Sequence, residues 1–149
     1  MDYFKCFQDS VNELKEIREY ESLNTLSKAI GIHQTTLSKW LTGKCYPTLN
    51  YAVKLADFFD CSLDYLFGLS DDSTFTKAKS QATFLERFTE LSAKSGLTDY
   101  AIAKRVKTKP GTIAKWRYRG NIPQMPKLIK LTEIFNCSLD YLAGRSDNL

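Results

Sequence analysis

The strongest constraint in this sequence is an internal repeat. The segment Cys61–Asp71 returns with few changes as Cys137–Asp147, an offset of 76 residues (137 minus 61) that also carries Trp40 onto Trp116. Two such units account for nearly all of the 149 residues, so the chain is one unit written twice. The period is longer than the roughly 20–50 residues of solenoid repeats. Each copy is therefore expected to be a small domain of its own.

The repeat also sets the expected domain boundaries. We predict a first domain over residues 1–69, a linker over residues 70–81 and a second domain over residues 82–149. The linker is rich in Ser, Asp, Thr and Lys, which is typical of an exposed connection. Its one large apolar residue, Phe75, can dock on a neighbouring element.

The first copy is predicted to be all-α, with five helices. Apolar residues recur at helical spacing along the first helix, at Phe7, Val11, Leu14 and Ile17. A second short helix can be capped by Ser22 or Asn24, and a third runs over residues 34–41. A fourth helix follows Pro47, and Ser62 caps the last one.

The second copy repeats this order. Thr98 is expected to cap its second helix, and Pro110 to open its third, since the first helical position needs no N–H donor. The fourth helix is predicted over residues 124–135, and Ser138 caps the fifth. Neither copy has the alternating β-branched pattern of a strand, so no sheet is expected.

The composition argues against a metal centre or an enzyme. The four cysteines form no C-x-x-C pair and the chain has a single histidine, so we expect no metal and no cofactor. No catalytic motif or constellation is present, and no catalytic residue is predicted. The sequence has no signal peptide and no run of 18 apolar residues, which favours a cytoplasmic, nucleoid-associated protein without a membrane partner.

Charge is divided unevenly between the copies. Residues 1–72 carry 7 basic and 11 acidic residues, a net charge of −4, whereas residues 73–149 carry 14 basic and 6 acidic residues, a net charge of +8. A strongly basic half points to a polyanionic partner, of which nucleic acid is the leading candidate.

An ordered set of motifs in both copies resembles a known family. The run Leu26–Gly43, followed by Pro47 and Ser62–Leu66, resembles the Cro/CI (Xre-type) helix-turn-helix family of bacterial and phage regulators. The second copy matches through Leu97-Thr98, Ile102–Lys104, Thr112–Trp116, Gly120, Pro123 and Ser138–Leu142. The resemblance implies two tandem five-helix, lambda-repressor-like domains that bind double-stranded DNA. It also leaves open a homodimer or an intrachain pseudo-dimer.

The third helix of the first copy carries the predicted base-reading residues. Leu37, Trp40 and Leu41 form its inner side, and the outward residues are His33, Gln34, Thr35, Ser38 and Lys39. Glutamine can bond adenine in a bidentate manner and lysine can reach guanine, while Thr and Ser adapt to several bases. His33 stands where the family usually has a Ser or Thr cap, and it can contact DNA or simply be exposed.

The second copy departs from this pattern. Pro110, Gly111 and Ala114 replace Gln34, Thr35 and Ser38, and these side chains cannot read bases by hydrogen bonding. We predict contacts to the DNA backbone instead, from Lys44 in the first copy and from Lys107, Lys109, Thr112, Lys115, Arg117, Tyr118 and Arg119 in the second.

The second helix also departs from the family, whose members commonly begin it with a phosphate-binding Gln. Leu23 and Asp99 hold these positions here, and the carboxylate of Asp99 would repel a phosphate. The leading function is a sequence-specific DNA-binding transcriptional regulator, a repressor. The alternative is a protein-interaction module, antitoxin-like or anti-repressor, in which the second domain docks a protein partner.

Overall fold

The computed structural model describes residues 2–79 and 81–149, and in these residues it contains ten helices and no strand. The chain divides into two compact units, Met1–Thr74 and Phe75–Leu149. The predicted all-α class, with five helices in each copy, is confirmed. The polar stretch 70–81 is divided between the two units.

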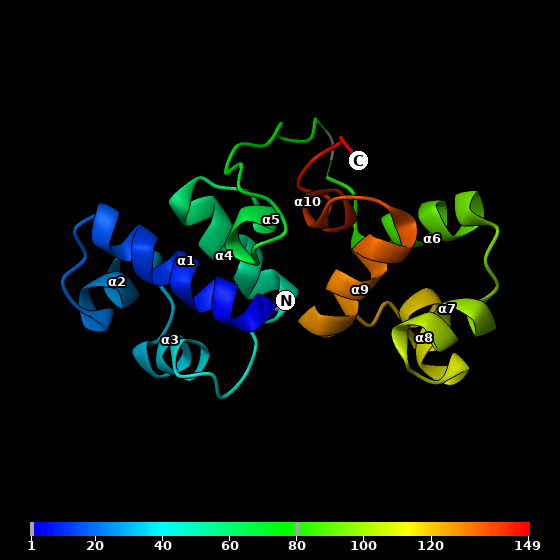
Figure 1. Cartoon of the computed structure of the whole chain (residues 1–149), viewed down its shortest axis with the longest axis horizontal. Helices are drawn as coiled ribbons and strands as arrows, with labels where there is room; N and C mark the ends of the chain where they lie inside the picture. The colour runs from blue at the N-terminus through cyan, green and yellow to red at the C-terminus, as the bar shows by residue number, and fades with distance from the viewer. Residues whose placement is uncertain (1, 80) are drawn as a thin grey trace. The chain divides into compact units, whose positions relative to one another are not determined.

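The five helices of unit 1 are shown in Figure 1. Their bounds are α1 (Tyr3–Ile17), α2 (Leu23–Ile30), α3 (Gln34–Leu41), α4 (Leu49–Phe59) and α5 (Leu63–Leu66). Those of unit 2 are α6 (Phe84–Ser95), α7 (Asp99–Val106), α8 (Pro110–Tyr118), α9 (Met125–Phe135) and α10 (Leu139–Leu142). The prediction for the fourth helix of the second copy was one residue too long at its start, because Gln124 is its N-cap.

Side-chain caps begin most of these helices. Ser62 and Ser138 accept the backbone N–H three residues on, and Thr98 does the same at α7. Of the two candidates for α2, Ser22 is the cap and forms a capping box with Thr25. Each such cap contributes about 1 kcal/mol to stability, so short helices such as α5 and α10 have fixed starting points.

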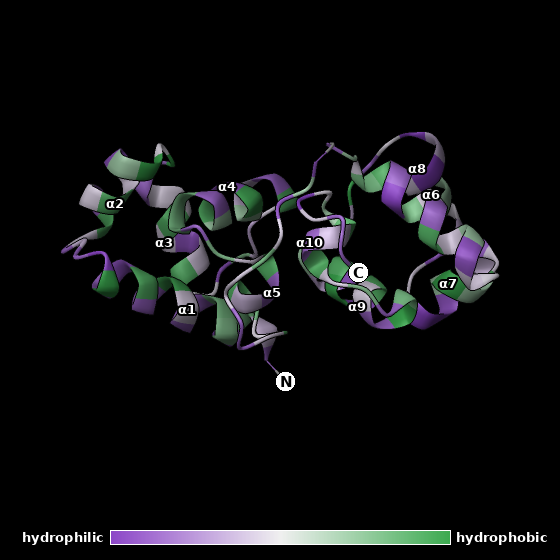
Figure 2. Ribbon diagram, turned by 90° about the horizontal axis from the view of Figure 1, so that it is seen from above, coloured by the Kyte–Doolittle hydropathy of each residue, from purple (hydrophilic) through white to green (hydrophobic). Residues whose placement is uncertain are grey.

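Each unit buries a core of its own. Figure 2 shows hydrophobic and hydrophilic stretches alternating along the helices of both units. In unit 1 the rings of Phe7 and Phe67 stack with centroids 5.0 Å apart. In unit 2 the rings of Phe88 and Trp116 are nearly perpendicular, with centroids 6.1 Å apart. One predicted core residue is misplaced: Ile17, the last residue of α1, is 64% exposed because the helix has run past the core.

The segments after α5 and α10 fold back in the same way. Ser62 donates its backbone N–H to the carbonyl of Ser73, and Ser138 donates to the carbonyl of Leu149. In unit 2 a second segment joins this tail, since Lys77 forms an antiparallel bridge with Ser146. Phe75, expected to dock on a neighbour, lies under the guanidinium of Arg145 at 4.1 Å from its ring centroid. Much of the stretch predicted to be linker is therefore bonded into a domain.

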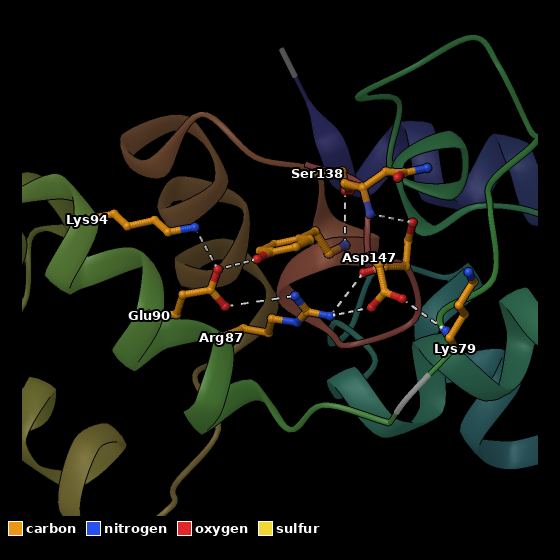
Figure 3. Close-up of polar contacts among 9 residues, drawn as sticks. Lys79, Arg87, Glu90, Lys94, Ser138 and Asp147 are labelled. Atoms are coloured by element: carbon orange, nitrogen blue, oxygen red, sulfur yellow. Dashed lines mark hydrogen bonds and ion pairs between the residues drawn. The ribbon is translucent and has the colours of Figure 1, made fainter.

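A polar cluster around Arg87 holds the tail of unit 2 against α6 (Figure 3). Arg87 lies 2.9 Å from a carboxylate oxygen of Asp147, and its guanidinium covers the ring of Tyr141 at 4.0 Å. The Tyr141 hydroxyl donates to Glu90 at 2.6 Å, and Lys94 pairs with the same carboxylate at 3.0 Å. Unit 1 has no such cluster among its described residues. The segment that follows the fifth helix is therefore held by different contacts in the two units.

Candidate nucleic-acid interface

Helices α2 and α3 of unit 1 are joined by a tight turn that fixes the position of α3. Gly31 ends α2 in the left-handed conformation, with φ of 78°, which glycine adopts without strain. Ser27 donates its hydroxyl to the carbonyl of Ile32, and the Ile32 side chain is buried. The Ser27 hydrogen bond and the buried Ile32 side chain thus both hold the turn.

The start of α3 presents its side chains to solvent. His33 is the N-cap, and its Nδ1 atom accepts the backbone N–H of Thr35 at 3.2 Å. An imidazole that accepts at Nδ1 when neutral carries its proton on Nε2, where it can donate outward. His33, Gln34, Thr35 and Lys39 are exposed and Ser38 is half-buried, so none of the five predicted base-reading residues lies in the core. We call this set the α3 face.

A shallow depression of about 480 Å³ lies along the α3 face. Its lining residues are Asn24, Ser27, His33, Gln34, Thr35 and Ser38. Asn24 and Ser27 come from α2 and were absent from the sequence-based site, because helical spacing within α3 says nothing about what lies across the turn. Their position two and five residues after the Ser22 cap is the signal that could have indicated them.

The equivalent turn in unit 2 is built from different residues. Lys107 takes the place of Gly31 and adopts φ of 60°, a left-handed conformation that costs a non-glycine residue about 1–2 kcal/mol. Lys127 of α9 donates its ammonium group to the carbonyl oxygens of Val106, at 2.8 Å, and Lys107, at 3.2 Å. In unit 1 Lys54 of α4 plays this part, donating to Gly31 at 3.2 Å. A lysine therefore closes the turn in both units, from different positions.

Helix α8 has a basic outer surface, and its first two residues carry no hydrogen-bonding side chain. Pro110 and Gly111 open the helix, and an added Cβ at Gly111 would meet nothing within 4 Å. Four cationic side chains around them are exposed, and none makes an ion pair or side-chain hydrogen bond within residues 2–79 and 81–149. They are Lys107, Lys109, Lys115 and Arg119, which we call the basic face. The predicted Thr112 is half-buried and Tyr118 is exposed.

Arg117 differs from the other predicted backbone contacts. Its guanidinium pairs with Asp99 at 2.7 Å, donates to the hydroxyl of Ser92 at 3.2 Å and lies over the ring of Phe88 at 5.0 Å. The sequence-based prediction assigned it to the DNA backbone because it is basic, although its equivalent, Leu41, lies on the inner side of the third helix. The side chain instead connects α8 to α7 and α6, which satisfies its charge inside the unit and neutralises Asp99.

In each unit a tight turn joins two short helices, and the second of them, α3 or α8, has an exposed outer side. This geometry agrees with the comparison with known families. The helix-turn-helix family model matches the chain twice, over residues 14–66 and 91–142. The chain belongs to the Cro/CI-type helix-turn-helix family. Searches of curated proteins and of solved structures found no match.

Membership places this helix-turn-helix protein among DNA-binding regulators, a family of binding proteins rather than enzymes. Both matches contain a complete turn, from α2 to α3 and from α7 to α8. No helix in the described part of the chain is both long and apolar enough to cross a bilayer. Within the same residues no group of three or more His, Cys, Asp or Glu side chains could hold a metal ion.

Proposed function

We propose that this helix-turn-helix protein is a sequence-specific regulator in which unit 1 reads bases and unit 2 adds phosphate contacts. The observation that carries the proposal is the difference between the two equivalent helices. The α3 face presents an amide, hydroxyls, an imidazole and an ammonium, whereas α8 begins with Pro110 and Gly111.

The chemistry of the α3 face suits the floor of a major groove. Gln34 can bond both N6 and N7 of adenine, and Lys39, five residues along the helix, can donate to guanine. Asn24, across the turn on α2, can bond a phosphate or a base edge at the rim of the depression. The sequence left open whether His33 contacts DNA or is simply exposed. We propose a DNA contact, because Nδ1 accepts the N–H of Thr35 and leaves Nε2 available to DNA.

The basic face of unit 2 suits the phosphate backbone. Its four cations are exposed and free of carboxylate partners in the described residues, so phosphates can neutralise them without breaking an internal ion pair. Arg117 is left out of this set because its guanidinium is already paired with the carboxylate of Asp99. We propose repression as the outcome, since occupancy of a DNA site is by itself enough to exclude another protein.

Selection of bound duplexes from a random pool tests the proposal. The intact chain is expected to enrich one sequence motif, and the triple variant Gln34→Ala, Thr35→Ala, Lys39→Ala is expected to lose that motif while keeping most non-specific affinity. Survival of the motif in the triple variant would show that unit 1 is not the reader. Absence of any duplex binding at low salt would favour the alternative of a protein-interaction module.

A further inference from the structure

Two tyrosine side chains in unit 2 are left in solvent. Tyr100 is 68% exposed and Tyr118 is 79% exposed, the highest exposures among the large apolar and aromatic residues of the described chain. Neither ring stacks on another aromatic residue, and neither hydroxyl forms a hydrogen bond within residues 2–79 and 81–149. The fold therefore gives these rings no structural role.

The two tyrosines belong to one end of the α7–α8 pair. Tyr100 follows Asp99 at the start of α7, and Tyr118 follows Arg117 at the end of α8. Because Arg117 and Asp99 are in direct contact at 2.7 Å, the backbone segments that carry the rings are held together. Figure 1 shows α7 and α8 side by side.

Each tyrosine has an exposed lysine one helical turn away. Lys104 lies four residues after Tyr100 on α7, and Lys115 lies three residues before Tyr118 on α8, so each pair shares a helix face. The only carboxylate on either helix is Asp99, and Arg117 neutralises it. We call Tyr100, Lys104, Lys115 and Tyr118 the tyrosine–lysine surface.

We propose that the tyrosine–lysine surface binds single-stranded nucleic acid, with unpaired bases stacked on the two rings and phosphates paired with the two lysines. Exposed aromatic rings beside cations are the usual means of holding single strands, and stacking tolerates any base. Duplex DNA offers phosphates to the lysines but keeps its base faces covered, so it would leave both rings unused. The absence of hydrogen-bonding side chains on Pro110 and Gly111 suits a partner that is not read by base edges.

An acidic protein surface is the competing partner for cations and tyrosines. The net charge of +8 on unit 2 attracts either partner, but two separate rings, each with its own lysine at one-turn spacing, match a repeating base-and-phosphate unit. This activity goes beyond duplex recognition by unit 1 and does not depend on it.

Fluorescence anisotropy with the full chain tests the proposal. The probes are an oligothymidylate and an oligouridylate of about 20 nucleotides, long enough for one small domain, and a duplex of random sequence. Tyr100→Ala with Tyr118→Ala is expected to weaken single-strand binding by roughly tenfold or more, the loss expected for removing stacked rings. Duplex affinity is expected to fall by a smaller factor than single-strand affinity, because the four cations of the basic face remain.

The variant Tyr100→Phe with Tyr118→Phe is the matched control, since it keeps both rings and removes both hydroxyls. It should bind single strands like the parent chain. Binding to either oligonucleotide supports the proposal, and the tighter of the two shows whether DNA or RNA is preferred. The proposal would be overturned if the parent chain bound neither oligonucleotide, or if the Ala variant lost duplex and single-strand affinity equally. It would also be overturned if the Phe variant bound single strands as weakly as the Ala variant.

The triple variant of the α3 face keeps this test separate from the proposed regulator function. It should lose its duplex motif and retain single-strand binding, so failure of either proposal is visible without the other. Folding of the tyrosine variants can be verified through the fluorescence of Trp116, which is buried in unit 2, and folding of the triple variant through that of Trp40, which is buried in unit 1.

Discussion

Arg117 holds Asp99 with two hydrogen bonds, from Nη2 at 2.7 Å and from Nε at 3.3 Å. The equivalent positions in unit 1 are Leu41 and Leu23, both half-buried. An ion pair in one copy thus occupies the positions of two leucines in the other, at the point where the two helices of the turn are held together.

We expect this ion pair to be exchangeable for leucines. Arg117→Leu leaves the carboxylate of Asp99 without its partner and should lower the free energy of unfolding of unit 2 by about 1–2 kcal/mol, between the values for exposed and buried pairs. Adding Asp99→Leu should recover most of that loss. Urea unfolding followed through the fluorescence of Trp116, in a Trp40→Phe background, measures unit 2 alone. If the effects of the two substitutions on the free energy of unfolding simply added, the expectation would be wrong.

Replacing Gly144 should destabilise the fold more than replacing Gly31, Gly43, Gly96 or Gly120, which also have positive φ. Its φ is 79°, and an added Cβ would overlap the carbonyl oxygen of Ala82. Gly144→Ala should destabilise unit 2 by about 3 kcal/mol or more, from strain in the left-handed region and from overpacking. Gly96→Ala is the control, because its φ is 69° with nothing within 4 Å, and it should cost about 1 kcal/mol. Equal losses would show that the contact with Ala82 is unimportant.

The cluster around Arg87 should make unit 2 sensitive to acid. The backbone N–H of Lys79 and then the guanidinium of Arg87 lower the pKa of Asp147 below its ordinary value of 3.8. Hydrogen bonds from Tyr141 and Lys94 lower the pKa of Glu90 below 4.5. A lowered folded-state pKa stabilises the fold above the unfolded-state pKa, and this stabilisation is lost as pH falls through the folded-state value.

We therefore expect the free energy of unfolding of unit 2 to decline progressively below about pH 5. Asp147→Asn should lower stability near neutral pH and make the acid limb shallower. Glu86→Gln, an exposed residue of α6 outside the cluster, should leave the shape of the limb unchanged. Urea unfolding repeated across this pH range measures both, and an unaltered limb in the Asp147 variant would contradict the assignment.

The basic face should control the salt dependence of duplex binding rather than its sequence preference. Lys115→Gln and Arg119→Gln should each weaken binding similarly on all sequences and reduce the slope of log K against log salt by about 0.9. Lys130→Gln is the matched control, because its ammonium already pairs with Glu133 at 3.2 Å. A loss confined to one DNA sequence would mean that these residues read bases.

The sequence indicated most of the local structure correctly because local rules determine it. Ser62 and Ser138 were predicted as caps from residue type and position alone, and Pro110 was predicted to open a helix, as observed. The bounds of α3 also follow from its apolar spacing and from the break at Gly43. Prediction was less accurate where a helix runs past its core, as at Ile17.

The sequence by itself determined the duplication, the all-α class, the helix-turn-helix order and the outward residues of α3, because each depends on periodicity or on neighbours within one turn. Tertiary structure decided what each charge faces. It turned Arg117 inward to Asp99, brought Asn24 and Ser27 across the turn, and bonded part of the predicted linker to the tail of unit 2. These contacts join residues far apart along the chain, so spacing within a helix carries no record of them.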